Sequence, residues 1–232
     1  MTAPDLVNIP VISIDGPSGS GKGTIAREVA LALGWHLLDS GALYRLVAMA
    51  ADDTGQIDAS EQELAQIAAG LEVRFATNEE GKEQIWLAGQ EVSGRVRTEA
   101  SGLMASKIAA LPEVRTGLLQ LQRDFRIAPG LVADGRDMGS MVFPDSRLKV
   151  FLTASAEERA KRRYKQLKDK GIDVSLPALS RDIEDRDRRD CERKIAPLRP
   201  AADARLLDSS NLTIDEVTQT VLDWAHELKI GT

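Results

Sequence analysis

Hydrophobic and polar residues along the chain follow periods that predict alternating strands and helices. Residues 11–15 form a β-branched apolar run that enters a glycine-rich turn, and residues 24–33 then place apolar side chains at helical spacing, with Gly34 as the expected end. A second apolar strand over 35–38 precedes helical composition over 42–51. These segments predict two strand–helix units at the start of a parallel sheet.

The pattern changes between residues 60 and 93. Ser60 and Glu63 have the spacing of a capping box, which predicts a helix that ends at Gly70. Residues 71–93 then alternate weakly between apolar and polar side chains, with turn residues between the runs. We expect a small antiparallel insertion of two or three strands in this segment.

Strand and helix periods return in the second half of the chain. The predicted helices are 98–110 and 112–125, and the predicted strands are 131–134, 148–152 and 206–208. Thr213 and Glu216 form a second capping box at the start of a closing helix. The order of these elements predicts an α/β fold with a parallel-sheet core.

The composition narrows the classes of protein that fit. Lys and Arg number 30 against 36 Asp and Glu in 232 residues, and a net charge of −6 argues against non-specific binding to nucleic acid. A single cysteine, Cys191, and two histidines exclude a disulfide framework and leave too few ligands for a structural zinc site. No signal sequence or membrane-spanning stretch is recognisable, so we expect a cytoplasmic protein without a membrane partner.

The glycine-rich turn after the first strand is the clearest functional motif. Residues 16–24 contain the G-x-x-x-x-G-K spacing, in which backbone N–H groups surround phosphate oxygens and Lys22 reaches the outer phosphates. The N-terminus of the following helix adds its positive end to the same site. Gly23 stands where the usual motif has the Ser or Thr that contacts Mg²⁺, and the hydroxyl comes one residue later at Thr24. The motif therefore predicts a phosphate site and leaves a metal contact by the loop open.

Arginines near small or acidic residues mark four further candidate places. These are 40–45, Ser106 with Arg115, 134–137, and 186–193. Arginine suits phosphate because its planar guanidinium binds two oxygens at once. Arg186, Asp190 and Arg193 are spaced i, i+4, i+7 on one helical face, as are Arg159, Arg162 and Arg163 at i, i+3, i+4. Ion pairs along a solvated helix are the alternative interpretation of both sets.

Taken together, these motifs resemble those of the bacterial cytidylate kinases, which are nucleoside monophosphate kinases. The segments that carry the resemblance are 14–24, 38–45, 133–139, 186–190, 196–198 and 201–204. It extends over essentially the whole chain and accounts for Gly23, since the family also has glycine after the loop lysine.

The resemblance implies a three-layer P-loop nucleoside monophosphate kinase fold, with a parallel-sheet core, a small antiparallel insertion and a short lid. The core would comprise 1–39, 94–155 and 172–232. A monophosphate-binding part would span 40–93, and a lid would span 156–171 with Gly171 near its hinge.

The activity implied is transfer of the γ-phosphoryl group of ATP to CMP or dCMP, with Mg²⁺ as the metal. The ATP phosphates would lie on Gly16, Pro17, Ser18, Gly19, Ser20, Gly21, Lys22, Gly23 and Thr24. The monophosphate would be held by Ser40, Arg45, Ser106, Arg115, Arg136, Asp137, Arg186, Asp190 and Arg193.

Roles within the acceptor set also follow from the resemblance. Arg45 and Arg136 would bind the phosphate, whereas Arg186 and Asp190 would contact the sugar hydroxyls. The residues assigned to the cytosine edge are Ser106, Arg115 and Asp137. Tyr44 would support the pocket or simply pack in the core.

The implied chemistry is electrostatic and needs no general base. The catalytic residues would be Lys22, Arg136, Arg159 and Arg163, the last two from a lid that excludes water. A solvated helix remains the alternative for that segment. Mg²⁺ would be held mainly by ATP and water, with Thr24 and Asp134 as candidate contacts.

Two other activities remain open from the sequence. The first is a P-loop kinase for another nucleoside monophosphate or a small alcohol. The second is a nucleotide-hydrolysing switch, which Gly23 argues against, because such a module needs a metal-binding hydroxyl directly after the lysine. We expect a monomer with small-molecule partners only.

Overall fold

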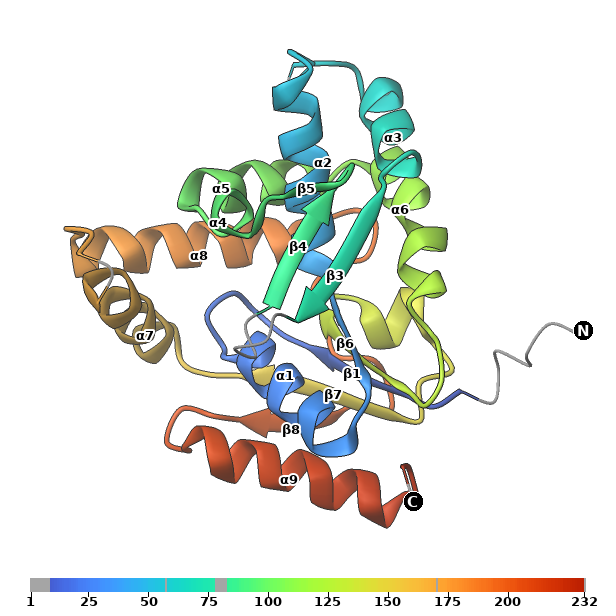
Figure 1. Cartoon of the computed structure of the whole chain (residues 1–232). Coiled ribbons are helices and arrows are strands. Elements are labelled where there is room, and N and C mark those ends of the chain that lie inside the picture. Colours follow the sequence, from blue (N-terminus) through green and yellow to red (C-terminus); the bar gives the residue numbers. More distant parts are fainter. Residues whose placement is uncertain (1–8, 57, 78–82, 170, 232) are drawn as a thin grey trace, which may run out of the picture. The chain divides into compact units, whose positions relative to one another are not determined.

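The described chain forms two compact units. The computed structural model describes residues 9–56, 58–77, 83–169 and 171–231. As far as they are described, Met1–Asp39 and Arg123–Thr232 form one unit, and Ser40–Gln122 forms the other (Figure 1). Residues 94–122, which the sequence assigned to the core, group with the second unit. The predicted functional division into core, monophosphate-binding part and lid remains a prediction.

The first unit is built on a five-stranded parallel sheet. Its strands are β1 (Val11–Asp15), β2 (His36–Asp39), β6 (Leu131–Gly135), β7 (Leu148–Thr153) and β8 (Arg205–Asp208). They lie in the order β2-β6-β1-β7-β8, so β1 pairs with β6 on one side and with β7 on the other. The loop after β1 thus leaves the sheet where the strand order reverses, which is the usual place for a ligand in such sheets.

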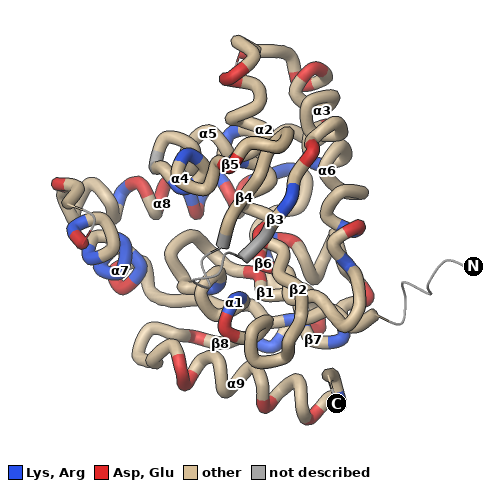
Figure 2. The backbone as a smooth tube through the Cα atoms, viewed as in Figure 1, with Lys and Arg blue, Asp and Glu red and all other residues tan. Residues whose placement is uncertain are grey.

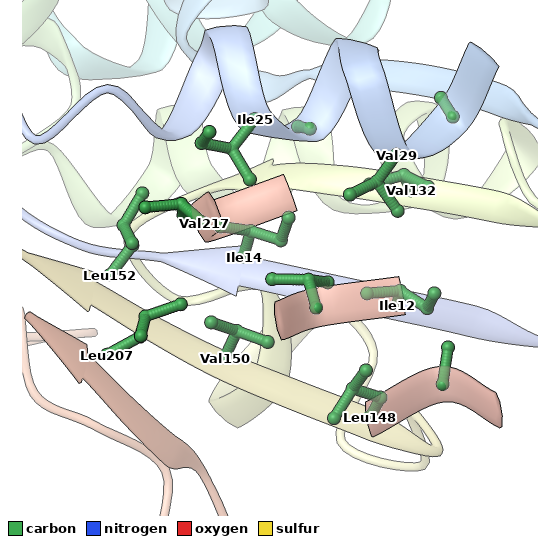
Figure 3. Close-up of a cluster of buried hydrophobic side chains, with 14 of the residues drawn as sticks. Ile12, Ile14, Ile25, Val29, Val132, Leu148, Val150, Leu152, Leu207 and Val217 are labelled. Carbon is green, nitrogen blue, oxygen red and sulfur yellow. The ribbon is translucent and has the colours of Figure 1, made fainter. Parts of the chain in front are cut away.

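A hydrophobic cluster joins one face of this sheet to α1 (Lys22–Leu33) and α9 (Ile214–Glu227). Figure 3 shows Ile12 and Ile14 of β1 together with Ile25 of α1 and Val217 of α9. Because successive side chains of a strand point to opposite faces, Ser13 is directed away from this cluster. The same alternation places Ser13 and Asp15, two buried polar residues, on the other side of β1.

Two helices of the first unit are rich in charged residues and contribute side chains to the site described below. They are α7 (Ala156–Asp169) and α8 (Leu176–Glu192), and basic and acidic residues are interspersed along both (Figure 2). A short π-helix, η2 (Met138–Val142), follows β6 and was not predicted. The capping box of Thr213 and Glu216 is present at the start of α9, as expected.

The second unit contains the predicted antiparallel insertion. Its helices are α2 (Ser40–Asp53), α3 (Glu61–Ala69), α4 (Ser93–Val96), α5 (Glu99–Ile108) and α6 (Pro112–Asp124), which runs to the boundary of the unit. Its strands are β3 (Val73–Thr77), β4 (Glu83–Leu87) and β5 (Gln90–Glu91), in the order β3-β4-β5. The three strands confirm the insertion, whereas α4 is too short to show a period in the sequence.

Among the helices that the structure describes, none is long and apolar enough to cross a membrane.

Candidate active site

The glycine-rich loop runs directly from the central strand β1 into helix α1. Gly21 is the N-cap of α1 with φ of 91°, a left-handed conformation that glycine adopts without steric cost. No side chain of the described residues caps this helix end. The first N–H groups of α1 therefore remain available for an anion, and the helix dipole favours negative charge at the same place.

Lys22 is buried at the base of this loop. Its Nζ donates a hydrogen bond to the Pro17 carbonyl at 3.3 Å and lies 4.0 Å from Oδ1 of Asp134. Burial and the positive charge of Arg136 together lower the pKa of Lys22 to about 8, although the neighbouring Asp134 carboxylate acts in the opposite direction. The lysine is thus held in place before any phosphate binds.

The Asp134 side chain lies close to residue 23. A Cβ atom at Gly23 would lie 3.1 Å from Oδ2 of Asp134, a tight contact from which the carboxylate would have to move by a few tenths of an ångström. Asp134 Oδ1 is buried and has no hydrogen-bond partner among the described residues, and burial raises the pKa of this carboxyl. A carboxylate oxygen therefore lies beside the first turn of α1, next to the loop.

This arrangement suits a cation that is held together with a nucleotide. Oxygen is the ligand that Mg²⁺ prefers, and Oδ1 of Asp134, which makes no hydrogen bond among the described residues, is such a ligand. Thr24, the other candidate, is exposed on the first turn of α1. Within the described ranges, no group of three His, Cys, Asp or Glu side chains forms an independent metal site. A single carboxylate such as Asp134 is suited to a Mg²⁺ ion whose other ligands are phosphate oxygens and water.

The lowered pKa of Lys22 predicts how phosphate binding depends on pH. Above pH about 8 the free protein loses the positive charge of Lys22, so the affinity of the loop for a polyphosphate should fall as the pH rises from 8 to about 9.5. Phosphate groups, with a pKa near 6, do not titrate in this range. Isothermal titration calorimetry at several pH values measures the effect, and an affinity that stays constant across the range would contradict it.

A second charged cluster lies within the same unit around Asp190 of α8. Its carboxylate accepts a hydrogen bond from Arg136 Nε at 2.9 Å and pairs with Arg193, and the residue is 1% exposed. Burial alone would raise the pKa of Asp190, but the positive charges of Arg136 and Arg193 outweigh it and lower the pKa. Arg186 lies one helical turn earlier on α8 and adds to the positive charge around this carboxylate.

Asp137 lies between the cluster around Asp190 and the strand that carries the phosphate loop, because it follows Arg136 at the end of β6 and β6 pairs with β1. Asp137 is buried, follows Arg136 directly, and is the N-cap of η2. Its carbonyl accepts a hydrogen bond from the Met141 N–H at 2.9 Å. Arg136 and Asp137 therefore stand at the carboxyl end of β6, beside the strand that carries the loop.

Two arginines of α7 contact the phosphate loop through its carbonyl groups. Arg159 is 5% exposed, donates to the Ser18 carbonyl at 2.9 Å and pairs with Asp187 at 2.6 Å. Arg162 donates to the Ser20 carbonyl at 3.3 Å and to the Ser209 carbonyl at 2.6 Å. These contacts hold the outer side of the loop.

The third arginine of α7 has different surroundings. Arg163 hydrogen-bonds to Gln166 on its own helix. Arg159 and Arg162 thus bond to loop carbonyls, and Arg163 bonds to a residue of α7. The predicted catalytic roles of Arg159 and Arg163 remain predictions. The sequence missed Arg162, Asp187 and Ser209 as loop-supporting residues, and only the shared helical spacing pointed to the first of them.

The remaining predicted acceptor residues belong to the second unit. Arg45 of α2 donates to the carbonyls of Val96 and Thr98 at 2.9 and 3.1 Å. Arg115 of α6 donates to the Ala109 carbonyl at 3.0 Å, and its guanidinium lies 5.6 Å from the ring centroid of Tyr44, which is buried.

The two predicted acceptor serines of this unit, Ser40 and Ser106, are buried as well. Ser40 is the first residue of α2, and Ser106 lies on α5, which packs along α2. The Ser106 hydroxyl has no hydrogen-bond partner among the described residues. Such an oxygen is suited to a ligand, because a buried hydroxyl without a partner is costly.

Fold and site together define a class of protein. A parallel sheet in this strand order carries a phosphate loop at its reversal point, with buried arginines beside the loop and a small antiparallel sheet inserted after the second strand. This combination is the α/β fold of the P-loop nucleoside monophosphate kinases.

Comparison with known proteins identifies the family. The sequence model described as "Cytidylate kinase" matches residues 12–227. A protein named cytidylate kinase from Nitrosococcus oceani is 58% identical over 217 residues, which are 93% of this chain and 96% of that protein. One of the same name from Methylococcus capsulatus is 59% identical over 214 residues, which are 92% and 96% of the two chains. The chain belongs to the cytidylate kinase family, and it is therefore a phosphotransferase.

Proposed function

We propose that this enzyme transfers the γ-phosphoryl group of ATP to CMP or dCMP, giving ADP and CDP or dCDP. The observation that carries the proposal is the buried cluster of Arg136, Asp190 and Arg193, which lies in the same unit as the phosphate loop with Lys22. Such a cluster suits a second phosphorylated ligand, because a protein with net charge −6 needs local cations to hold one. The name of the relatives supports cytidylate as that ligand.

The donor residues would act on the triphosphate by position and charge. The unpaired N–H groups at the start of α1 and the ammonium of Lys22 face the place where the phosphates would lie. In phosphoryl transfer the charge spreads over the transferring oxygens, and fixed positive groups stabilise it without needing to rearrange. Arg159 and Arg162 contribute indirectly by holding the loop carbonyls.

The acceptor residues would orient the attacking phosphate oxygen. We assign Arg136 to the phosphate of the monophosphate, and Arg186, Asp190 and Arg193 to its sugar and to charge balance. The phosphate oxygen is already deprotonated at neutral pH, since its second pKa lies near 6. No base is needed, which agrees with the presence of only two histidines in the chain.

We assign the metal to Asp134. Mg²⁺ bound with ATP would neutralise charge on the β- and γ-phosphates, and Oδ1 of Asp134, which makes no hydrogen bond to any residue that the structure describes, would hold the ion or its water ligands. Asp134 also keeps Lys22 beside the loop through their 4.0 Å ion pair.

A coupled assay with a panel of acceptors tests the proposal. The enzyme, ATP and Mg²⁺ are incubated with CMP, dCMP, UMP, AMP or shikimate, and ADP formation is measured. We expect CMP and dCMP to be the best acceptors, with weaker activity towards UMP because the two bases differ only at one edge. ADP formation that does not depend on CMP would favour a nucleotide-hydrolysing switch. Activity with AMP or shikimate alone would favour a kinase with another acceptor.

The substitution Asp137→Ala tests the assignment of base recognition. An ionised carboxylate accepts hydrogen bonds from the amino group of cytosine, which uracil lacks. The ratio of kcat/KM for CMP to that for UMP should therefore fall by roughly tenfold, the effect of losing one hydrogen bond to a charged group. Steady-state kinetics with both acceptors measures it. Asp145→Ala, at an exposed carboxylate paired with Arg126, is the control and should leave the ratio unchanged.

A further inference from the structure

The buried carboxylate of Asp15 has no role in the chemistry described above. We propose that Asp15 is a positioning residue that ties the phosphate loop to the turn carrying Arg136 and Asp137, and that it thereby sets the affinity for the acceptor nucleotide. The proposal rests on the assignment of these two residues to the acceptor.

The Asp15 side chain accepts hydrogen bonds from the backbone of that turn. Asp15 is the last residue of β1, directly before Gly16 of the loop, and it is 5% exposed. One carboxylate oxygen accepts the Met138 N–H at 2.8 Å, and the other accepts the Gly139 N–H at 2.9 Å. Both oxygens are thus directed at backbone groups at the start of η2 and not at a ligand.

The backbone on both sides of Arg136 and Asp137 is bound to Asp15. At one end, Gly135 pairs with Asp15 in the parallel ladder of β6 and β1. At the other end, Met138 and Gly139 are held by the Asp15 side chain. Only Arg136 and Asp137 lie between these points, so their backbone is constrained on both sides by a single residue of β1.

Close packing leaves the turn little freedom to move by itself. A Cβ atom at Gly139 would lie 2.7 Å from the Ser13 hydroxyl and 3.1 Å from the side-chain carbons of Lys149. The turn therefore lies directly against β1 and β7, and only glycine allows this approach. The Gly139 N–H reaches Asp15 because of it.

The charge of Asp15 supports the same role. Burial raises the pKa of Asp15 to about 6, a net value that includes the lowering effect of the two N–H groups and Arg136 and a further raising effect of Asp137. Asp134 of β6 is the other carboxylate that interacts with it. At neutral pH Asp15 is therefore ionised, and both of its oxygens accept hydrogen bonds.

The substitution Asp15→Asn tests the proposal, because asparagine has the same shape but can accept only one of the two N–H groups. The dissociation constant for CMP should rise by roughly tenfold, as expected for loss of a hydrogen bond to a charged group. The constant for ATP alone should change by less than about twofold, because no hydrogen bond of the loop itself is lost. Isothermal titration calorimetry measures both constants, and thermal unfolding measures stability.

Ser146→Ala provides a matched control. Ser146 is also buried, and its hydroxyl donates to the Val11 carbonyl at 3.0 Å, at the opposite end of β1 from Asp15. This variant should lose stability but bind CMP as the wild type does. The proposal is overturned if Asp15→Asn loses stability in the same way and its CMP affinity is unchanged, or if the affinities for CMP and ATP fall together.

A second variant covers the case in which Asp15→Asn does not fold. Gly139→Ala would displace the turn while leaving Asp15 intact, so it should also weaken CMP binding more than ATP binding. Unchanged CMP affinity in that variant would contradict the proposal. If the wild type phosphorylates another acceptor instead of CMP, the proposed function is wrong, and the same comparison is made with that acceptor.

Discussion

Replacing Lys22 by alanine should lower kcat by roughly a hundred- to a thousandfold, the usual effect of removing one group that stabilises developing charge. The ammonium is held beside the loop by the Pro17 carbonyl and Asp134, so no other described side chain replaces it without a rearrangement. CMP binding should be retained, because the residues assigned to the acceptor do not include Lys22. Steady-state kinetics and calorimetry with CMP measure the two quantities.

The matched control for this prediction is Lys161→Ala on α7. Lys161 is half exposed and pairs with Glu157 one turn away on the same helix, an arrangement that contributes little to stability. This variant should keep the wild-type rate. A near-normal rate for Lys22→Ala would remove the loop lysine from the chemistry. Loss of CMP binding in that variant would show that Lys22 serves the acceptor as well.

The substitution Asp190→Ala should lower the free energy of unfolding by about 3–5 kcal/mol, the usual effect of removing one partner from a buried ion pair. It would leave Arg136 and Arg193 as neighbouring positive charges without their shared carboxylate. The KM for CMP should rise by at least tenfold, since both arginines would be free to adopt other positions. Urea unfolding and steady-state kinetics measure these effects.

Asp185→Ala is the control on the same helix. Asp185 pairs with Arg188, and both side chains are more than half exposed, so this pair should contribute less than about 1 kcal/mol. The control should leave both stability and the KM for CMP near the wild-type values. If Asp190→Ala behaves like this control, the cluster around Asp190 is not the acceptor site and the assignment of Arg136 is wrong.

The order of strands and helices could be predicted because each element shows its own period. The β1–loop–α1 unit is an example, since an apolar run, a glycine motif and helical spacing follow one another directly along the chain. Each of these signals depends only on residues that are close in sequence. The antiparallel insertion was also recognisable, from alternation over β3 and β4. The elements that were missed, α4 and η2, span 4 and 5 residues, too few to show a period.

The phosphate loop could be predicted from the sequence more fully than the arginine clusters. The loop was recognised in full, because the motif is a continuous stretch. The arginines were recognised as a set, but their partners were not, since charge and helical spacing do not specify which carboxylate faces which guanidinium. Arg159 and Arg162 bond to loop carbonyls while Arg163 bonds within its helix, although all three share one spacing in the sequence.

The sequence by itself determined the fold class, the phosphate loop and the family, because these depend on residues that are near one another along the chain or on motifs in a fixed order. Only the tertiary structure decided that Arg136 pairs with Asp190, 54 residues away, and that Asp15 holds the Met138 N–H, 123 residues away. It also placed the Asp134 carboxylate beside Gly23, where a Cβ atom would lie 3.1 Å from Oδ2. Contacts of this kind arise when the strands pair, and the pairing brings together residues that no local pattern connects.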